Sequence, residues 1–191
     1  MFEKIANAIV EQLEKEKLIE KCMKEQYLYA LLTMTERWIT ITTIVVISLI
    51  SNLFVPTCLF LLFFLSLRKR TGGYHAEKFW QCYLGTIGTY IFIVVLCPAM
   101  LKYLTLMNIM VLMSVILIAV IGTVNHPNMA MNDLEFSESK KSARYRLLLE
   151  CMVMSAFYFM GIDNIYMGYM SFAIILCAIL LAVAKVLGQE V

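Results

Sequence analysis

The chain has 191 residues, of which 61% are hydrophobic and only 16% are charged, and its formal net charge is +2. A soluble domain is about 45–50% apolar and about 25% charged, so this composition excludes an ordinary soluble globular protein. The charged residues lie between long apolar stretches, which is the pattern of a chain folded in a lipid bilayer.

The first segment, residues 1–26, has apolar residues at roughly helical spacing with Glu and Lys between them. These apolar residues are Phe2, Ile5, Ile9, Leu13, Leu18 and Cys22. The pattern predicts an amphipathic helix that lies on the membrane surface or on the rest of the protein. The segment lacks the apolar core and small-residue cleavage site of a signal peptide, so we expect the N-terminus to stay in the cytosol.

The next apolar stretch, residues 38–67, is too long for one membrane span. As a single helix it would measure about 45 Å, whereas the hydrocarbon core is about 30 Å thick. The polar pair Ser51 and Asn52, followed by Pro56, favours a break. We therefore expect two spans, over about 27–51 and 56–68.

The basic run Arg68-Lys69-Arg70 and then the turn signal Thr71-Gly72-Gly73 precede the next apolar stretch. We expect the helix that follows to end before Pro98, and a polar loop over residues 125–143. The final stretch is again too long for one span, and a Gly-Ile-Asp-Asn turn divides it. The remaining four spans are predicted over about 76–96, 105–124, 145–161 and 165–187.

The positions of the basic residues predict the orientation. If the N-terminus is cytosolic, the outer loops keep only Lys102 of the 16 Lys and Arg residues. We therefore predict an all-α, polytopic membrane protein with one domain, 1–191, in which an N-terminal amphipathic helix precedes six transmembrane helices. Both termini would be cytosolic.

Six cysteines are scattered along the chain without a Cys-x-x-Cys pair, at Cys22, Cys58, Cys82, Cys97, Cys151 and Cys177. This spacing suggests neither a disulfide framework nor a zinc site. Most of them are expected to be small buried hydrophobic residues. The chain also lacks HExxH and GxSxG motifs, so we expect no metal and no serine nucleophile.

One cysteine has a histidine near it. His75, one of two histidines, lies seven positions before Cys82. On a regular helix the two side chains would share a face but stand about 10 Å apart along the axis, so a working pair requires Gly72 and Gly73 to fold the chain back. An imidazole beside a thiol produces a nucleophilic thiolate. Spacing alone leaves open that His75 is a polar helix cap and Cys82 a packing residue.

These residues resemble the hallmark of the accessory gene regulator B family, bacterial membrane endopeptidases that mature cyclic peptide pheromones. The hallmark is a basic residue or two, Gly-x-His or Gly-Gly-x-His, and a Cys seven residues after the His. Here it reads Arg68-Lys69-Arg70-Thr71-Gly72-Gly73-Tyr74-His75 and Cys82. The chain length, charged N-terminal helix and six-segment layout are also similar. Val124-Asn125 departs from the Ala-Pro that is common in the family's loop.

The resemblance implies that Cys82 is the nucleophile and His75 the base of a cysteine endopeptidase. Its substrate would be a precursor peptide with an amphipathic leader and an acidic C-terminal tail. Attack on the bond before the tail would form a thioester, which ring closure to a thiolactone or lactone would release. Arg70, Lys140 and Lys141 are candidates to hold the tail, although each is equally a topology signal.

The resemblance further implies supporting roles for Arg68, Gly72 and Gly73. It also implies a homodimer in the bacterial cell membrane, with the active site at the cytosolic face and without cofactor or nucleic acid. Two alternatives remain: a non-catalytic peptide-binding adaptor and a small peptide exporter. Apolar spans nearly free of ionisable residues, with Glu150 near a helix start, are less typical of a transporter.

Overall fold

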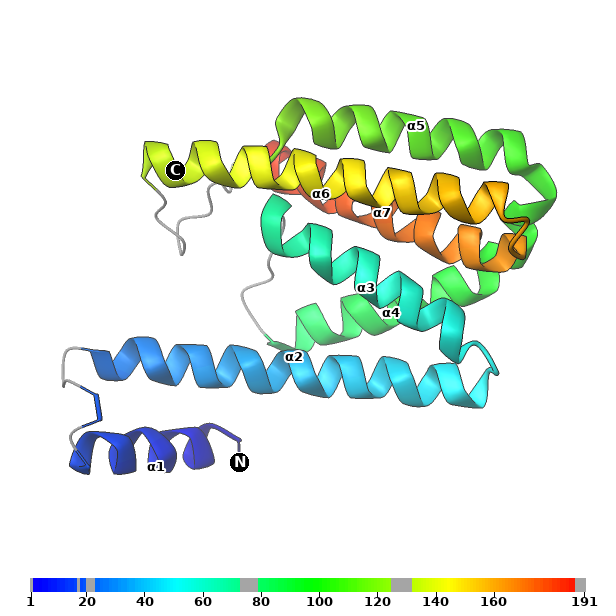
Figure 1. The fold of residues 1–191 in the computed structure, drawn as a ribbon. Helices are drawn as coiled ribbons and strands as arrows, with labels where there is room; N and C mark the ends of the chain where they lie inside the picture. Colours follow the sequence, from blue (N-terminus) through cyan, green and yellow to red (C-terminus); the bar gives the residue numbers. More distant parts are fainter. Residues whose placement is uncertain (1, 17, 20–22, 73–78, 125–131, 188–191) are drawn as a thin grey trace.

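The computed structural model describes residues 2–16, 18–19, 23–72, 79–124 and 132–187, and every regular element in this part of the chain is a helix (Figure 1). The prediction of an all-α fold is confirmed for these residues. The helices are α1 (Phe2–Lys15), α2 (Lys24–Ile50), α3 (Phe54–Thr71), α4 (Phe79–Met100), the short 3-10 helix η2 (Leu101–Tyr103), α5 (Leu104–Ile121), α6 (Asp133–Phe159) and α7 (Asn164–Val186).

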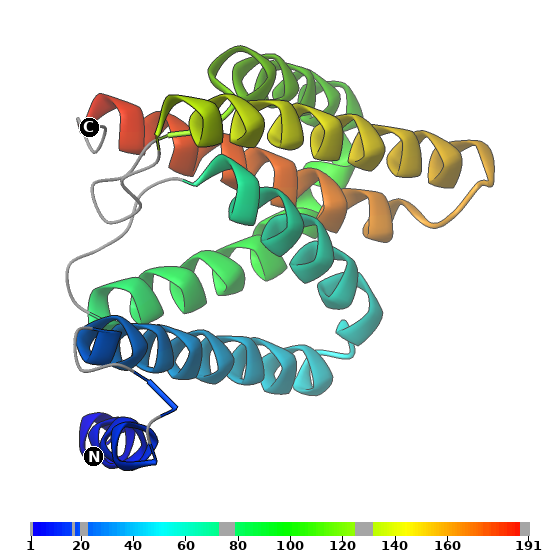
Figure 2. The same cartoon turned by 60° about the vertical axis from the view of Figure 1, so that its left-hand side comes forward.

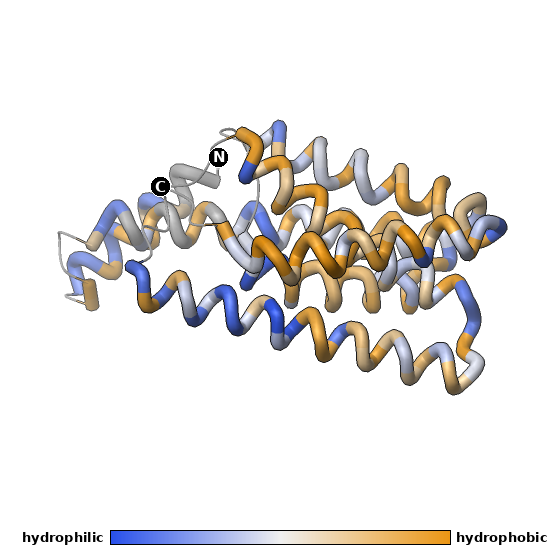
Figure 3. The backbone as a smooth tube through the Cα atoms, turned by 90° about the horizontal axis from the view of Figure 1, so that it is seen from above, coloured by the Kyte–Doolittle hydropathy of each residue, from blue (hydrophilic) through white to orange (hydrophobic). Residues whose placement is uncertain are grey.

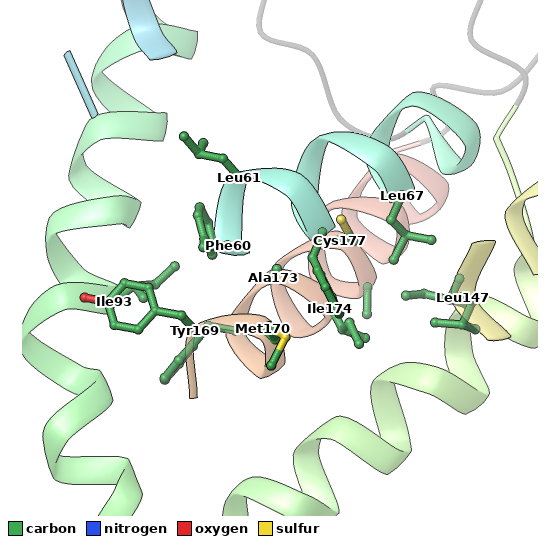
Figure 4. Packing of buried hydrophobic residues seen from close by; sticks show 14 of the residues in the cluster. Phe60, Leu61, Leu67, Ile93, Leu147, Tyr169, Met170, Ala173, Ile174 and Cys177 are labelled. Carbon is green, nitrogen blue, oxygen red and sulfur yellow. The ribbon is translucent and has the colours of Figure 1, made fainter. Parts of the chain in front are cut away.

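Helix α7 is the centre of the fold. It packs against α3, α4, α5 and α6, and from α2 to α7 each helix runs opposite to the one before it (Figure 1). In Figure 4 side chains of α7 lie among those of α3, α4 and α6. The residues of α7 labelled there are Tyr169, Met170, Ala173, Ile174 and Cys177. This arrangement puts the start of α4 and the end of α3 at the same end of the bundle.

Two stretches of the described chain are long and apolar enough to cross a membrane, Trp80–Ile121 and Asn164–Val186. The first comprises α4, η2 and α5, and Figure 1 shows the chain turning back between α4 and α5. Figure 3 shows hydrophobic residues along these helices, whereas hydrophilic residues gather at α1, at the first half of α6 and at helix ends.

The N-terminal helix is shorter than the predicted 1–26. It ends at Lys15, and α2 begins at Lys24. Helix α1 lies outside the bundle and packs on α2 (Figure 2), with Val10 fully buried. The Lys24 ammonium donates to the Glu14 carboxylate at 3.0 Å, and this hydrogen bond raises the pKa of Lys24. The surface that α1 covers therefore includes the first turns of α2.

The chain breaks between α2 and α3 at the Ser51-Asn52 pair. Asn52 has φ 54°, a left-handed conformation that asparagine adopts more readily than most residues. The Leu53 N–H donates to the Ser48 carbonyl at 2.8 Å, so one of the last carbonyl groups of α2 has a hydrogen-bond partner. Pro56 lies in the first turn of α3, where its missing N–H costs no helical hydrogen bond.

The expectation that a helix ends before Pro98 is wrong. Pro98 lies inside α4, which continues to Met100. Proline removes only its own hydrogen bond to the carbonyl four residues earlier. At this position, close to the end of α4, few further helical bonds follow it, so one lost bond does not stop the helix.

The expectation of a polar loop over 125–143 is wrong from Asp133 onward, because α6 begins there. Asn132 caps the helix. Its side chain accepts from the Glu135 N–H at 2.9 Å, and the Glu135 carboxylate accepts from the Asn132 N–H at 3.0 Å. Such reciprocal capping satisfies two amides that a helix start otherwise leaves without partners. Helix α6 thus extends well before the predicted 145–161 span.

Candidate active site

The end of α3 is fixed by a glycine that no other residue replaces without strain. Gly72 has φ 67°, and a Cβ added there would stand 3.2 Å from the Val124 carbonyl oxygen. Its N–H donates to the Arg68 carbonyl at 3.1 Å. The Arg68 guanidinium in turn donates to the Gly72 carbonyl. Arg68 and Gly72, two of the predicted supporting residues, therefore form one closed turn.

Helices α5 and α6 are bonded to this turn. The Thr71 carbonyl accepts from the Val124 N–H at 3.1 Å and from the Thr123 hydroxyl at 3.2 Å. The Ser139 hydroxyl of α6 donates to the Arg70 carbonyl at 3.2 Å. Three helices that are distant in sequence thus meet where the basic run of α3 ends.

Basic side chains of α6 surround the same end. Lys140 packs so closely on Gly122 that a Cβ there would lie 3.0 Å from the Lys140 Cγ, and its ammonium stands 4.3 Å from the centre of the Phe136 ring. Arg144 donates to the Ala119 carbonyl at 2.8 Å. Lys141 is exposed. These contacts place Lys140 against the end of α5. Lys141 follows it in α6, and the Arg70 carbonyl of α3 is bonded to Ser139, the residue before Lys140.

Cys82 lies in the first turn of α4, and its thiol is exposed and not in a disulfide. Because α3 and α4 run in opposite directions, the end of α3, with Arg68 and Gly72, and the start of α4, with Cys82, lie at the same end of the bundle (Figure 1).

The start of α4 is held against α2 through the residue after Cys82. The hydroxyls of Tyr83 and Thr43 are 3.1 Å apart and share a hydrogen bond. The Trp80 ring packs edge-on against the Tyr83 ring at a centroid distance of 6.1 Å. The backbone that carries Cys82 is thereby anchored from one side.

The proposed base is not among the described residues. Gly73 and His75 lie in the segment 73–78, outside the part of the chain that the structure describes. The fold-back at the double glycine and the approach of His75 to Cys82 therefore stay predictions. Of the predicted turn, the structure describes Gly72, and there the chain does leave the helical conformation.

Comparison with known protein families shows to which family the chain belongs. A family model described as accessory gene regulator B matches residues 2–181, nearly the whole chain. The chain belongs to the accessory gene regulator B family. The search of curated proteins and the search of solved structures gave no match. Family membership supports a part in quorum-sensing peptide processing, since the family acts on a precursor peptide. Together with the two apolar stretches, it supports localisation to a membrane.

One polar contact in this accessory gene regulator B protein was not foreseen from the sequence. Glu150 of α6 is only 2% exposed and accepts from the Ser66 hydroxyl at 2.7 Å. Its second oxygen has no hydrogen-bond partner among the described residues. The sequence does contain a signal for Glu150, because an ionisable residue within an apolar stretch is a candidate functional residue by default. Its partner in α3 was not predictable from the sequence.

The described residues contain no group of three or more His, Cys, Asp and Glu side chains able to hold a metal ion. Within this part of the chain, the groups available for chemistry at the basic end are a thiol, guanidinium and ammonium groups, and backbone amides. Such a set suits nucleophilic attack by a thiolate and electrostatic binding of an anionic peptide.

Proposed function

We propose that this family member is a membrane-embedded cysteine endopeptidase that removes the C-terminal tail of a peptide pheromone precursor. Cys82 is the nucleophile and His75 the base. The observation that carries the proposal is the exposed, free Cys82 thiol in the first turn of α4. Family membership supplies the substrate class.

Cys82 stands in the N-terminal turn of α4, and the N-terminal turn of a helix carries partial positive charge. His75 accepts the thiol proton, which makes the anion available at neutral pH.

The reaction proceeds by acyl transfer. The Cys82 sulfur attacks the carbonyl carbon of the peptide bond that joins the pheromone to the tail. The C–N bond breaks, and the tail's new amino group takes the proton held by His75. The pheromone segment remains as a thioester on Cys82.

Ring closure releases the product. A thiol or hydroxyl within the pheromone segment gives its proton to His75 and attacks the thioester carbonyl, and Cys82 leaves as the thiolate. The product is a thiolactone or lactone. A site at the bilayer boundary limits competing hydrolysis of the thioester, because water is scarce there.

The topology that we propose has α2 to α7 crossing the bilayer in alternating directions, with the active site at the cytosolic face of a bacterial cell membrane. Its support is the gathering of basic residues at the end that holds Cys82, whereas Lys102 lies at the other end, in η2. Arg70, Lys140 and Lys141 attract the acidic tail of the precursor. The assembly into a homodimer is proposed from the family resemblance alone.

The test is release of the tail from a precursor co-expressed with the wild-type protein, Cys82→Ala or His75→Ala. Wild type releases the tail, and both variants lose release while the protein still accumulates in the membrane. Cys58→Ala is the matched control, since Cys58 is also an exposed, free thiol but lies in the first turns of α3. Full cleavage by both active-site variants would overturn the proposal and favour an adaptor or exporter.

A further inference from the structure

Three helices carry an exposed aromatic ring at the beginning of their apolar part. In α2 this ring is Trp38, which follows the last charged residue of the helix and is 64% exposed. In α4 it is Trp80, the first residue of the apolar stretch Trp80–Ile121, which is 67% exposed. In α6 it is Tyr145, which follows one arginine, precedes another and is 67% exposed. Exposed tryptophan and tyrosine rings at such a transition are typical of the boundary between lipid and water.

The two tryptophans stand at nearly the same level of the bundle. Helices α2 and α4 run in the same direction (Figure 1), and the hydrogen bond between the hydroxyls of Thr43 and Tyr83 relates their heights. Trp38 precedes Thr43 by five residues, and Trp80 precedes Tyr83 by three. At ~1.5 Å per residue the tryptophans therefore lie about 7.5 Å and about 4.5 Å before this bond along their helices. A single plane across the bundle passes close to both.

The tyrosine of α6 belongs to the same end of the bundle. Its neighbour Arg144 donates to the Ala119 carbonyl at 2.8 Å, and Ala119 is two residues before the end of α5. Helix α5 runs opposite to α4, so α5 ends at the level where α4 begins (Figure 1). Tyr145 therefore lies at the end of the bundle that carries Trp80.

From the three rings toward the other end of the bundle, the exposed surface is suited to lipid. Helix α2 has no charged residue over 38–50, and α4 has none along its whole length. The hydroxyl groups of α4 bond to their own helix, because Thr86 donates to the Cys82 carbonyl at 2.8 Å and Thr89 to the Gly85 carbonyl at 2.7 Å. Such bonds satisfy the hydroxyls without water, as a hydrocarbon environment requires.

On the other side of the rings, the surface is suited to water. Residues 24–37 continue α2 for about 20 Å, and α1 packs on α2 there (Figures 1 and 2). The apolar residues Ala6 and Val10 of α1 are buried, whereas Glu11 and Lys15 are exposed. A helix that lies on a membrane instead turns its apolar face to the lipid. The packing of α1 on α2 therefore favours a pair of helices in water.

We propose that Trp38, Trp80 and Tyr145 bind the headgroup region of a phospholipid bilayer and fix the depth of the bundle, so that α1 and residues 24–37 of α2 form a hairpin in the water phase. The inference rests on the topology proposed above and not on the chemistry of Cys82. Indole and phenol rings join a polar N–H or O–H to an apolar ring, which suits the layer between water and hydrocarbon. The arginines beside Trp38 and Tyr145 add attraction for anionic headgroups.

The experiment measures the quenching of tryptophan fluorescence by bromine atoms at two depths in a bilayer. The purified full chain is reconstituted into vesicles of phosphatidylglycerol and phosphatidylcholine, the latter brominated either near the headgroup or near the end of the acyl chain. The chain has two tryptophans, so Trp38→Phe reports Trp80 and Trp80→Phe reports Trp38. We expect the shallow bromine to quench both variants more strongly than the deep one. Equal or stronger quenching by the deep bromine, or none by either, overturns the anchor.

Two introduced tryptophans, each in a chain without Trp38 and Trp80, test the hairpin. Leu112→Trp, at an exposed position in the middle of α5, is the reference and is quenched mainly by the deep bromine. Tyr27→Trp, at an exposed position in the first turn of α2, escapes both bromines and is quenched by iodide in the water. Quenching of Tyr27→Trp by the shallow bromine, to the extent seen for Trp38, overturns the hairpin. Absence of deep quenching in Leu112→Trp overturns the topology on which the inference rests.

A misfolded variant does not leave the anchor untested. The wild-type protein reports both tryptophans together, and its fluorescence must also be quenched more strongly by the shallow bromine. Failure of the proposed function is seen separately, because in that case Cys82→Ala still releases the tail, whatever the depth of the two tryptophans.

Discussion

The Thr71 carbonyl oxygen accepts the Val124 N–H at 3.1 Å, and this bond ties the end of α3 to the end of α5. It passes directly beside Gly72, whose missing side chain leaves room for the Val124 carbonyl. Glycine at position 72 is therefore required by the packing of α3 on α5, in addition to its place before His75. Substitution of Gly72 can separate this structural role from catalysis.

Gly72→Ala is expected to destabilise the fold and to lower tail release. Gly72 combines φ 67° with ψ −143°, a region that is nearly restricted to glycine, so alanine there costs about 1–3 kcal/mol, and its Cβ would also press on the Val124 carbonyl. The measurement is thermal unfolding in detergent together with tail release. Gly85→Ala is the control, because a Cβ there meets nothing within 4 Å. Equal behaviour of the two variants would contradict this account of the α3 end.

A second glycine permits close packing between the start of α7 and the end of α4. A Cβ on Gly168 of α7 would stand 2.7 Å from the Cys97 sulfur of α4. We expect Gly168→Ala to lower the free energy of unfolding by about 1–3 kcal/mol, as overpacking generally does. Adding Cys97→Ala removes the clashing sulfur and recovers part of the loss in a double-mutant cycle. Strict additivity of the two changes would contradict the contact.

The hydrogen bond between Tyr83 and Thr43 anchors the start of α4. Tyr83→Phe and Thr43→Val are each expected to cost about 0.5–1.5 kcal/mol of unfolding free energy. The double variant costs less than the sum, because one bond is lost only once. Thermal unfolding of the four proteins measures this coupling, and a coupling energy of zero would show that α4 is held by other contacts.

Electrostatic capture of the acidic tail makes activity depend on salt. Lys141 is exposed at the basic end, and Lys141→Gln is expected to raise KM for the precursor several-fold at low ionic strength, with kcat unchanged. The difference from wild type shrinks as salt is added. Lys102→Gln, at the other end of the bundle, leaves KM unchanged. An equal effect of the two substitutions would exclude local capture of the tail by Lys141.

The start of α6 is fixed by the capping box. Asn132→Ala removes the side-chain acceptor for the Glu135 N–H and is expected to cost about 1 kcal/mol. The loss is local, so hydrogen exchange should speed up in the first turns of α6 and stay unchanged in α7. Uniformly faster exchange would indicate instead that the cap supports the whole bundle.

How far the sequence predicts the fold depends on the range of the interactions. Breaks set by local residues were predictable, as at Asn52 and at the turn before Asn164, where α7 begins. The start of α6 was missed although its Asn-x-x-Glu signature is local, because the charged run after it was interpreted as a loop. Pro98 was given more weight than its place near a helix end warrants.

The contacts that build the site are long-range. The bond between Ser66 and Glu150 joins residues 84 positions apart, and the bond from Ser139 to the Arg70 carbonyl joins residues 69 positions apart, so both depend on how α3 packs on α6. No periodicity in the sequence specifies these distances. The sequence was sufficient for the His75 and Cys82 hypothesis only because the short hallmark places both residues within one segment.

The central claim is tested most directly by trapping the acyl-enzyme. A precursor whose ring-closing Cys or Ser is replaced by Ala cannot cyclise, so the thioester persists. We predict that mass spectrometry finds the peptide without its tail on Cys82, that hydroxylamine removes it, and that Cys82→Ala carries none. Release of the tail by the wild-type protein with no adduct on Cys82, or with an adduct on another residue, would contradict the account.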